Sequence, residues 1–172
     1  MARLVFVDET STNTRLTKRT GCLRKEQRSV AYAPFGKWKT QTFIAGLRCH
    51  GLTAPVIVDA PMNSRIFEAW IEAQLAPTLS PGDVVILDNV GFQKSERAQQ
   101  LVKAKGEWLL FLPTYSPDRN PIEMAFSKLK ALLRKRAARS FGAITQALGD
   151  IVSLFSIAEC RNFFKAAGYE AE

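Results

Sequence analysis

Short apolar runs divide the chain into expected strands and helices. Residues 3 to 8 are mostly apolar and β-branched or aromatic, which predicts a buried strand ending on Asp8. Residues 83 to 88 (D-V-V-I-L-D) have the continuous apolar centre of a buried strand, and residues 108 to 112 repeat that character after a helix expected at about 95 to 105. Such a strand, helix, strand unit is expected to be parallel, with a right-handed crossover.

Two more strands are predicted in the first third of the chain. Residues 41 to 47 and 55 to 59 have strand character and are joined through residues 49 to 53, with a glycine at the turn, which predicts a hairpin. Residues 10 to 40 are polar, basic and interrupted by glycine and proline, so we expect a long excursion with a short strand near residues 30 to 33. Long irregular segments in compact domains are often functional.

Helical spacing of apolar residues accounts for most of the remaining chain. The expected helices are one capped by Ser64 that ends before Pro77, one from Pro121 to about Arg139, and two at residues 142 to 155 and 157 to 167. Asn120 is the expected N-cap of the second, while Ser156 and Glu159 form a capping box before the last, which Gly168 ends. This order of elements predicts an α/β domain in which helices flank both faces of a mixed sheet.

Composition narrows the class of protein. At 172 residues, 47% of them hydrophobic, the chain suits one buried core, so we expect a single domain over residues 1 to 172. The sequence has no apolar signal region and no run of membrane-spanning length, which predicts a soluble, cytoplasmic protein with no membrane partner. Three scattered cysteines and one histidine suit neither a disulfide framework nor a zinc site. Carboxylates must therefore carry any catalysis.

The net charge of +8 favours a polyanionic partner, and nucleic acid is the leading candidate. The basic residues form two blocks, an early one of Arg15, Lys18, Arg19, Arg24, Lys25 and Arg28, and a late one of Lys128, Lys130, Arg134, Lys135, Arg136 and Arg139. A run of charges is more often a solvated face, so the blocks alone are weak support for DNA binding.

Three carboxylates have positions that suit catalysis. Asp8 and Asp88 end apolar strands, and Glu123 lies in the first turn of a helix that follows a loop, so the three converge if the two strands are neighbours. A cluster of carboxylates without histidine or cysteine is an oxygen-only ligand set, which suits Mg²⁺ or Mn²⁺. Two such ions support in-line displacement at a phosphodiester.

Each of these carboxylates also has a structural interpretation. An aspartate at a strand end commonly caps a turn, and Glu123 stands three residues after Asn120, which is the spacing of a capping box. Asp59 and Asp118 occupy equally plausible positions for a catalytic carboxylate. Composition and periodicity leave this choice open.

The helix that begins at Pro121 places a basic stripe behind one of these acids. Glu123 lies in line with Ser127, Lys130 and Arg134 on one face. Lysine and arginine there would neutralise phosphates without reading bases, although a solvated face is an equally good interpretation of any one residue. The DNA-binding candidates are Lys130, Arg134, Lys128, Arg24 and Lys25.

Three motifs carry a resemblance to a known family. At Asp8 in F-V-D-E-T, at Asp88 in V-I-L-D-N-V, and at Glu123 in Y-S-P-D-R-N-P-I-E-M-A-F-S-K-L-K, the chain resembles DDE-type transposases of the bacterial insertion-sequence branch related to mariner elements. The similarity includes G-K-W-K-T-Q-T-F-I-A-G-L-R at residues 36 to 48 and extends to Tyr169, so it covers nearly the whole chain.

The resemblance implies a ribonuclease-H-like fold and the catalytic domain of a transposase. Such a domain is a metal-dependent DNA endonuclease and strand transferase that acts at transposon ends and target DNA. The resemblance implies that Asp8, Asp88 and Glu123 are catalytic and hold two Mg²⁺ or Mn²⁺ ions, which favours them over Asp59 and Asp118.

Two departures from the family pattern bear on partners and activity. Relatives often have a histidine a few residues after the second aspartate, where this chain has Gly91, Phe92 and Gln93. Relatives also carry an N-terminal region that recognises transposon ends, whereas here the first catalytic strand begins near Met1, so we expect that domain to be absent. The implied partners are an upstream helix-turn-helix half of the same element and, because mariner-like relatives act as dimers, a second copy of the chain. The resemblance also implies that residues 10 to 40 are the region in which relatives carry a loop that contacts a partner subunit or transposon DNA.

Two other functions stay open at this point. One is a nuclease of the ribonuclease-H or junction-resolving type, and the other is a catalytically inactive, DNA-binding transposase remnant. The basic blocks and the motifs disfavour a domain with no role in nucleic-acid chemistry.

Overall fold

The computed structural model describes residues 1–13, 40–104, 106–114, 116–138 and 140–169. The strands are β1 (Leu4–Asn13), β2 (Thr40–Arg48), β3 (Gly51–Val58), β4 (Val84–Leu87) and β5 (Trp108–Phe111). The α-helices are α1 (Ser64–Trp70), α2 (Glu96–Lys103), α3 (Pro121–Arg136), α4 (Phe141–Val152) and α5 (Ile157–Ala166). The other helical turns are η1 (Ile71–Leu75), η2 (Ala76–Thr78), η3 (Gly91–Lys94) and η4 (Pro117–Arg119). The short strand expected near residues 30 to 33 lies outside the described residues.

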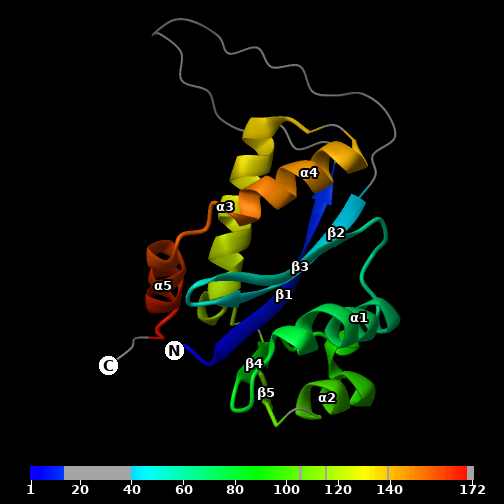
Figure 1. Cartoon of the computed structure of the whole chain (residues 1–172), viewed down its shortest axis with the longest axis vertical. Helices are drawn as coiled ribbons and strands as arrows, with labels where there is room; N and C mark the ends of the chain where they lie inside the picture. The colour runs from blue at the N-terminus through cyan, green and yellow to red at the C-terminus, as the bar shows by residue number, and fades with distance from the viewer. Residues whose placement is uncertain (14–39, 105, 115, 139, 170–172) are drawn as a thin grey trace, which may run out of the picture.

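The five strands form one mixed sheet in the order β3-β2-β1-β4-β5 (Figure 1). β1 pairs in antiparallel fashion with β2, which forms the expected hairpin with β3. On its other side β1 runs parallel to β4, and β4 runs parallel to β5, so the predicted parallel unit around α2 is confirmed. The carboxyl ends of β1, β4 and β5 therefore meet at one edge of the sheet.

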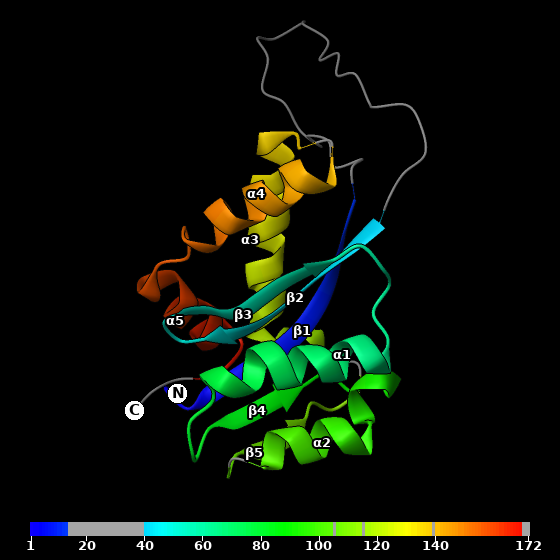
Figure 2. The same cartoon turned by 45° about the vertical axis from the view of Figure 1, so that its right-hand side comes forward.

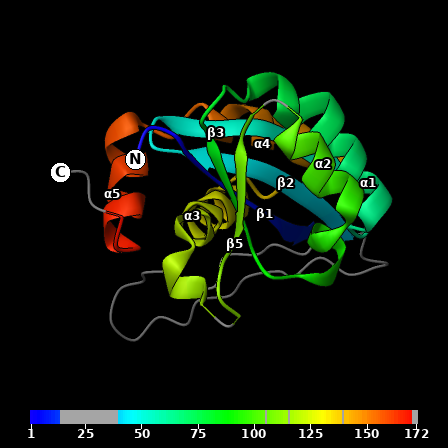
Figure 3. The same ribbon diagram turned by 90° about the horizontal axis from the view of Figure 1, so that it is seen from below.

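Helices cover both faces of the sheet, as the order of elements predicted. Side chains alternate along β1, so Val5 and Val7 pack with α1 and α2, whereas Phe6 packs with α3, α4 and α5. Figure 2 shows α1 and α2 in front of the sheet, and Figure 3 shows the strands between α3 on one side and α1 and α2 on the other. The sheet is thus the middle layer between two apolar clusters.

The first strand is longer than the apolar pattern predicted. The sequence suggested that the strand ends on Asp8, but β1 continues to Asn13 in register with β2 as far as Thr40. In the extension Thr10 and Thr12 are buried while Ser11 is exposed, which is the two-residue period of a strand. Threonine is polar but β-branched, so it favours strands without contributing to an apolar run.

The helix expected from Ser64 differs at both ends. Its N-cap is Asn63, whose Oδ1 accepts the backbone N–H of Ile66 at 3.0 Å. The α-helical part ends at Trp70, and the wider turns of η1 and then η2 complete the segment. Trp70 is fixed where the geometry changes, because its ring N–H donates to the carbonyl of Ala54 at 2.8 Å.

The last helix has the predicted ends. Ser156 and Glu159 form the capping box, and Gly168, which follows α5, has φ of 87°, in the left-handed region that glycine tolerates. No single helix in the described ranges has both the length and the apolar character needed to cross a bilayer; only α4 and α5 taken together do, and they are bent by 89° at their break.

Candidate active site

Two of the predicted carboxylates lie side by side at the carboxyl edge of the sheet. Asp8 is on β1 and is 6% exposed, and Asp88 immediately follows the last residue of β4. Because Val7 pairs with Leu87 in the parallel ladder, the next residues along the two strands are Asp8 and Asp88. The sequence left open whether these strands are neighbours, and the structure makes them adjacent.

The third carboxylate approaches this edge from α3. Glu123 lies in the first turn of that helix and is exposed. The pKa of Asp8 is raised to about 8, first by burial and then by the charges of Glu9, Glu123 and Asp88, against the opposing hydrogen bond from the backbone N–H of Glu9. Asp8 therefore lies in the electric field of all three neighbouring acids, whereas Asp59 and Asp118 are exposed on other parts of the chain.

Glu9 is a fourth acid at this edge, and sequence reasoning did not single it out. Burial raises its pKa, the hydrogen bond from Gln93 lowers it, and the charges of Asp88 and Glu123 raise it. The available signal was the pair of consecutive acids in F-V-D-E-T, directly after an apolar strand. Strand alternation obscures that signal, since it sends neighbouring side chains to opposite faces.

Asn120 ties the start of α3 to Asp8. Its Nδ2 donates to Asp8 Oδ2 at 3.1 Å, and the side chain is 3% exposed. Asn120 occupies the predicted N-cap position, but its side chain makes no capping bond, and Glu123 bonds to it only through backbone atoms. The capping-box interpretation of Glu123 is therefore wrong, because Asn120 Oδ1 accepts no backbone N–H of α3 and its Nδ2 is directed to Asp8 instead.

The oxygen donors of this cluster fit a hard divalent cation. Backbone N–H groups orient one oxygen of each aspartate, from Glu9 to Asp8 Oδ1 at 2.8 Å and from Asn89 to Asp88 Oδ1 at 2.7 Å. Converging carboxylates without nitrogen or sulfur donors are the chemistry that Mg²⁺ and Mn²⁺ prefer. Within the described ranges, no three or more acidic, histidine or cysteine side chains are already arranged to hold an ion.

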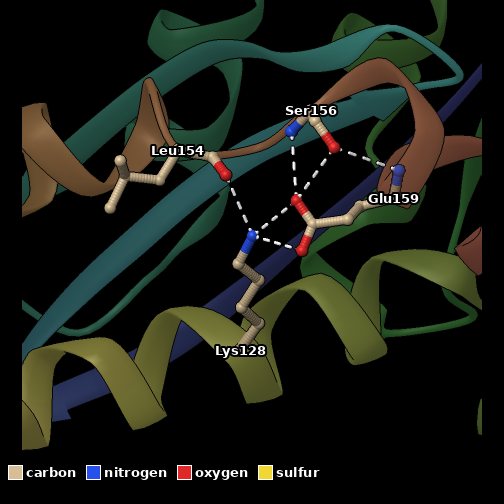
Figure 4. A network of polar contacts seen from close by, with 4 residues as sticks. All are labelled: Lys128, Leu154, Ser156 and Glu159. Atoms are coloured by element: carbon tan, nitrogen blue, oxygen red, sulfur yellow. Dashed lines mark hydrogen bonds and ion pairs between the residues drawn. The ribbon is translucent and has the colours of Figure 1, made fainter.

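The predicted DNA-binding residues fall into three groups. Lys130 and Arg134 are half-buried on the same face of α3 as Glu123, as the helical spacing predicted. Lys128 lies elsewhere on α3, where its Nζ donates to both carboxylate oxygens of Glu159 at 2.7 and 2.8 Å and to a backbone carbonyl (Figure 4). Its charge is thus used inside the protein to join α3 to α5. Arg24 and Lys25 lie outside the described residues.

The fold matches solved structures of the Mos1 mariner transposase, which places it in the ribonuclease-H-like class. The match to the Mos1 strand transfer complex has a TM-score of 0.78 and 14% identity, covering 96% of this chain and 51% of that chain. The match to the Mos1 paired-end complex with Mn has a TM-score of 0.76 and 14% identity, and it covers 96% of this chain and 52% of that chain. The match to the Mos1 catalytic domain alone has a TM-score of 0.68 and 12% identity, and it covers 98% of this chain and 78% of that chain. The chain therefore spans about half the length of the Mos1 chains in the complexes.

The family is shown by the sequence itself. The profile of the DDE superfamily endonucleases matches residues 3–145, and the chain belongs to this family. No curated protein matches the chain. The predicted fold class and the predicted DDE family are both confirmed.

Proposed function

We propose that this chain is the catalytic domain of a transposase of the bacterial insertion-sequence branch related to mariner elements. In this proposal it is a DNA endonuclease and strand transferase that acts at transposon ends and on target DNA. The proposal is supported by the neighbouring positions of Asp8 and Asp88 at one sheet edge, with Glu123 near enough to raise the pKa of Asp8, in a member of the DDE superfamily endonucleases.

The catalytic residues of the proposed enzyme are Asp8, Asp88 and Glu123, which would hold two Mg²⁺ or Mn²⁺ ions. Solved Mos1 paired-end complexes contain Mn or Mg, which supports this choice of metals. When bound, two such ions activate the attacking oxygen and stabilise the leaving oxygen of a phosphodiester. The negative charges of Glu9, Glu123 and Asp88 act on the buried Asp8, and such a group of carboxylates is suited to divalent cations.

The chain's own residues orient the acids and attract the substrate. Asn120 holds Asp8 by its amide and α3 begins at the next residue, so the position of Glu123 is coupled to that of Asp8. Farther along the same face of α3, Lys130 and Arg134 would contact DNA phosphates next to the acids.

The proposed enzyme also needs partners. Mos1 chains in the paired-end complex with the left transposon end are about twice as long as this one, so end recognition is proposed to come from a helix-turn-helix segment outside these 172 residues. We also propose that the chain acts as a homodimer. These 172 residues are then a single catalytic domain.

The deciding experiment is nicking of supercoiled DNA in Mg²⁺ or Mn²⁺ by the wild-type chain and by Asp88→Asn and Glu123→Gln. Asp118→Asn is the matched control, because Asp118 is an exposed acid in η4, just before α3. We expect both site variants to lose nicking by at least about a hundredfold, since each removes a metal ligand, while the control retains it. Nicking that survives in the site variants would contradict the proposed ligands.

The same assay separates the rival functions. Faster cleavage of an RNA–DNA hybrid or a four-way junction than of transposon ends would favour a ribonuclease-H or junction-resolving nuclease. DNA binding that is indifferent to Mg²⁺, with no cleavage even after an upstream end-recognition segment is joined to the chain, would favour an inactive remnant.

A further inference from the structure

Two buried side-chain amides, each from a different element, donate hydrogen bonds to consecutive acids of β1. Asn120, in the loop before α3, donates to Asp8 Oδ2 at 3.1 Å, and Gln93, in η3, donates through Nε2 to Glu9 Oε2 at 3.2 Å. Strand alternation directs these two acids to different faces of β1, but their carboxylates lie close enough that the charge of Glu9 raises the pKa of Asp8. Their side chains are almost completely buried, at 3% and 0% exposed.

Each amide uses its donor and leaves its acceptor unused. In the observed arrangement the amide nitrogen of each residue faces its acid, and a carboxylate oxygen accepts the hydrogen bond. Within the described part of the chain, Asn120 Oδ1 and Gln93 Oε1 are buried without a hydrogen-bond partner. Buried polar atoms without partners destabilise a fold, so two of them at one acidic cluster indicate that the cluster binds something in the working protein.

The charge of Glu9 is not needed for its contact with Gln93. A glutamine at position 9 could accept the same hydrogen bond. It would carry no negative charge next to the buried Asp8. The carboxylate is therefore costly to the fold. A positively charged ligand is the partner that compensates such a cost.

We propose that Glu9, held in place by Gln93, is a fourth carboxylate of the candidate active site and strengthens its binding of divalent cations. This inference rests on the proposed function. η3 begins only three residues after Asp88, so the bond from Gln93 joins the end of β4 to β1 where the acids meet. Gln93 is a positioning residue that acts through Glu9, because groups surrounding a metal site orient its ligands and tune its affinity.

The test is a titration of the metal-free chain with Mn²⁺ alone, with free Mn²⁺ measured by electron paramagnetic resonance. We expect Glu9→Gln to weaken binding at one site about tenfold, the usual size of an effect from a group around the ligands. Gln93→Leu should weaken it less. The double variant should bind no more weakly than Glu9→Gln, because Gln93 acts only through Glu9. Glu72→Gln, which removes an exposed acid on η1, should bind as the wild type does.

Thermal melting in EDTA distinguishes this role from a structural one. A merely structural contact would lower the melting temperature in Gln93→Leu and leave the affinity for Mn²⁺ unchanged in Glu9→Gln, and that result would overturn the inference. So would additive losses in the double variant. If Gln93→Leu fails to fold, Glu9→Gln alone decides, because it keeps the size and the hydrogen bond of the side chain.

Asp8→Asn separates this inference from the proposed function. Loss of Mn²⁺ binding in Asp8→Asn with wild-type binding in Glu9→Gln would refute the role of Glu9 and leave the proposed function standing. Unchanged binding in Asp8→Asn, or none in the wild type, would refute the metal site and the inference with it.

Discussion

At the scale of single residues, the feature that stands out is a buried aspartate kept among other acids. Asp8 is 6% exposed, and burial together with the charges of Glu9, Glu123 and Asp88 raises its pKa to about 8. The folded, metal-free protein therefore binds a proton that the unfolded chain has already lost at neutral pH. A residue in this state couples the stability of the fold to pH and to cations.

The first prediction concerns the pH dependence of stability in EDTA. The pKa of Asp8 rises on folding from 3.8 to about 8, so its stabilising contribution is full below 3.8 and is lost as pH rises through 8. We expect the melting temperature of the wild type to fall between about pH 5 and about pH 9. The melting temperature of Asp8→Asn should fall less over the same range. Asp118→Asn should follow the wild type. Parallel profiles for wild type and Asp8→Asn would contradict the pKa given for Asp8.

Sequence reasoning found the acids but not the amides that hold them. The motifs singled out Asp8, Asp88 and Glu123, and pairing of β1 with β4 explains why the first two are neighbours. The bonds of Asn120 and Gln93 could not be predicted, because each joins residues far apart in the chain. Residue patterns report local preference, whereas these contacts depend on which elements the sheet edge brings together.

At the scale of elements, α3 carries different charged groups on two of its faces. One face carries Glu123, Lys130 and Arg134 in line, and another carries Lys128, which is bound to Glu159 of α5 (Figure 4). The Lys128 ammonium also lies 4.5 Å from the centre of the Phe155 ring. The late basic block is thus divided between the face that carries Glu123 and an ion pair within the protein.

The second prediction separates these faces. Lys130→Met and Arg134→Met should each weaken binding to duplex DNA and reduce the slope of log affinity against log salt by about one, since each removes a phosphate contact. Lys128→Met should leave that slope unchanged and lower the melting temperature, because Glu159 loses its partner. Fluorescence anisotropy over a range of salt concentrations and thermal melting measure the two effects. A reduced slope in Lys128→Met would show that Lys128 also contacts DNA.

A buried ion pair fixes the end of β2 against the turn before β4. Arg48 Nη2 donates to Asp83 Oδ2 at 2.7 Å and to the carbonyl of Thr78 at 3.0 Å, and the side chains of the pair are 9% and 7% exposed. Burial alone would raise the pKa of Asp83, but the hydrogen bond and charge of Arg48 outweigh it and lower the pKa. The apolar pattern gave no sign of this pair, because both residues border strands in the sequence as ordinary polar ends.

The third prediction follows from that burial. Arg48→Met should destabilise the fold by about 3 kcal/mol, because it leaves Asp83 buried without its partner. The double variant with Asp83→Asn should recover much of the loss, since the amide can still accept the backbone N–H of Ser80. Urea unfolding measures both values. A loss below about 1 kcal/mol in Arg48→Met would mean that water reaches the pair, as at an exposed site.

At the scale of the whole molecule, charge and length together suggest how the chain meets DNA. The net charge is +8, although the candidate active site is acidic, so the excess positive charge lies elsewhere on the molecule. Contacts of lysine and arginine to phosphates give affinity that depends on salt and carries no sequence information. The chain also spans only about half the length of the Mos1 chains found in DNA complexes.

The last prediction is that these 172 residues bind duplex DNA without distinguishing its sequence. Two duplexes of equal length and unrelated sequence should bind with equal affinity, and both affinities should fall linearly with log salt, because release of counterions from the phosphates drives the association. Anisotropy titrations of both duplexes at several salt concentrations measure this. A preference above about tenfold for one duplex, which equals about 1.4 kcal/mol, would mean that this chain itself reads bases. The segment proposed for end recognition would then not be the sole source of specificity.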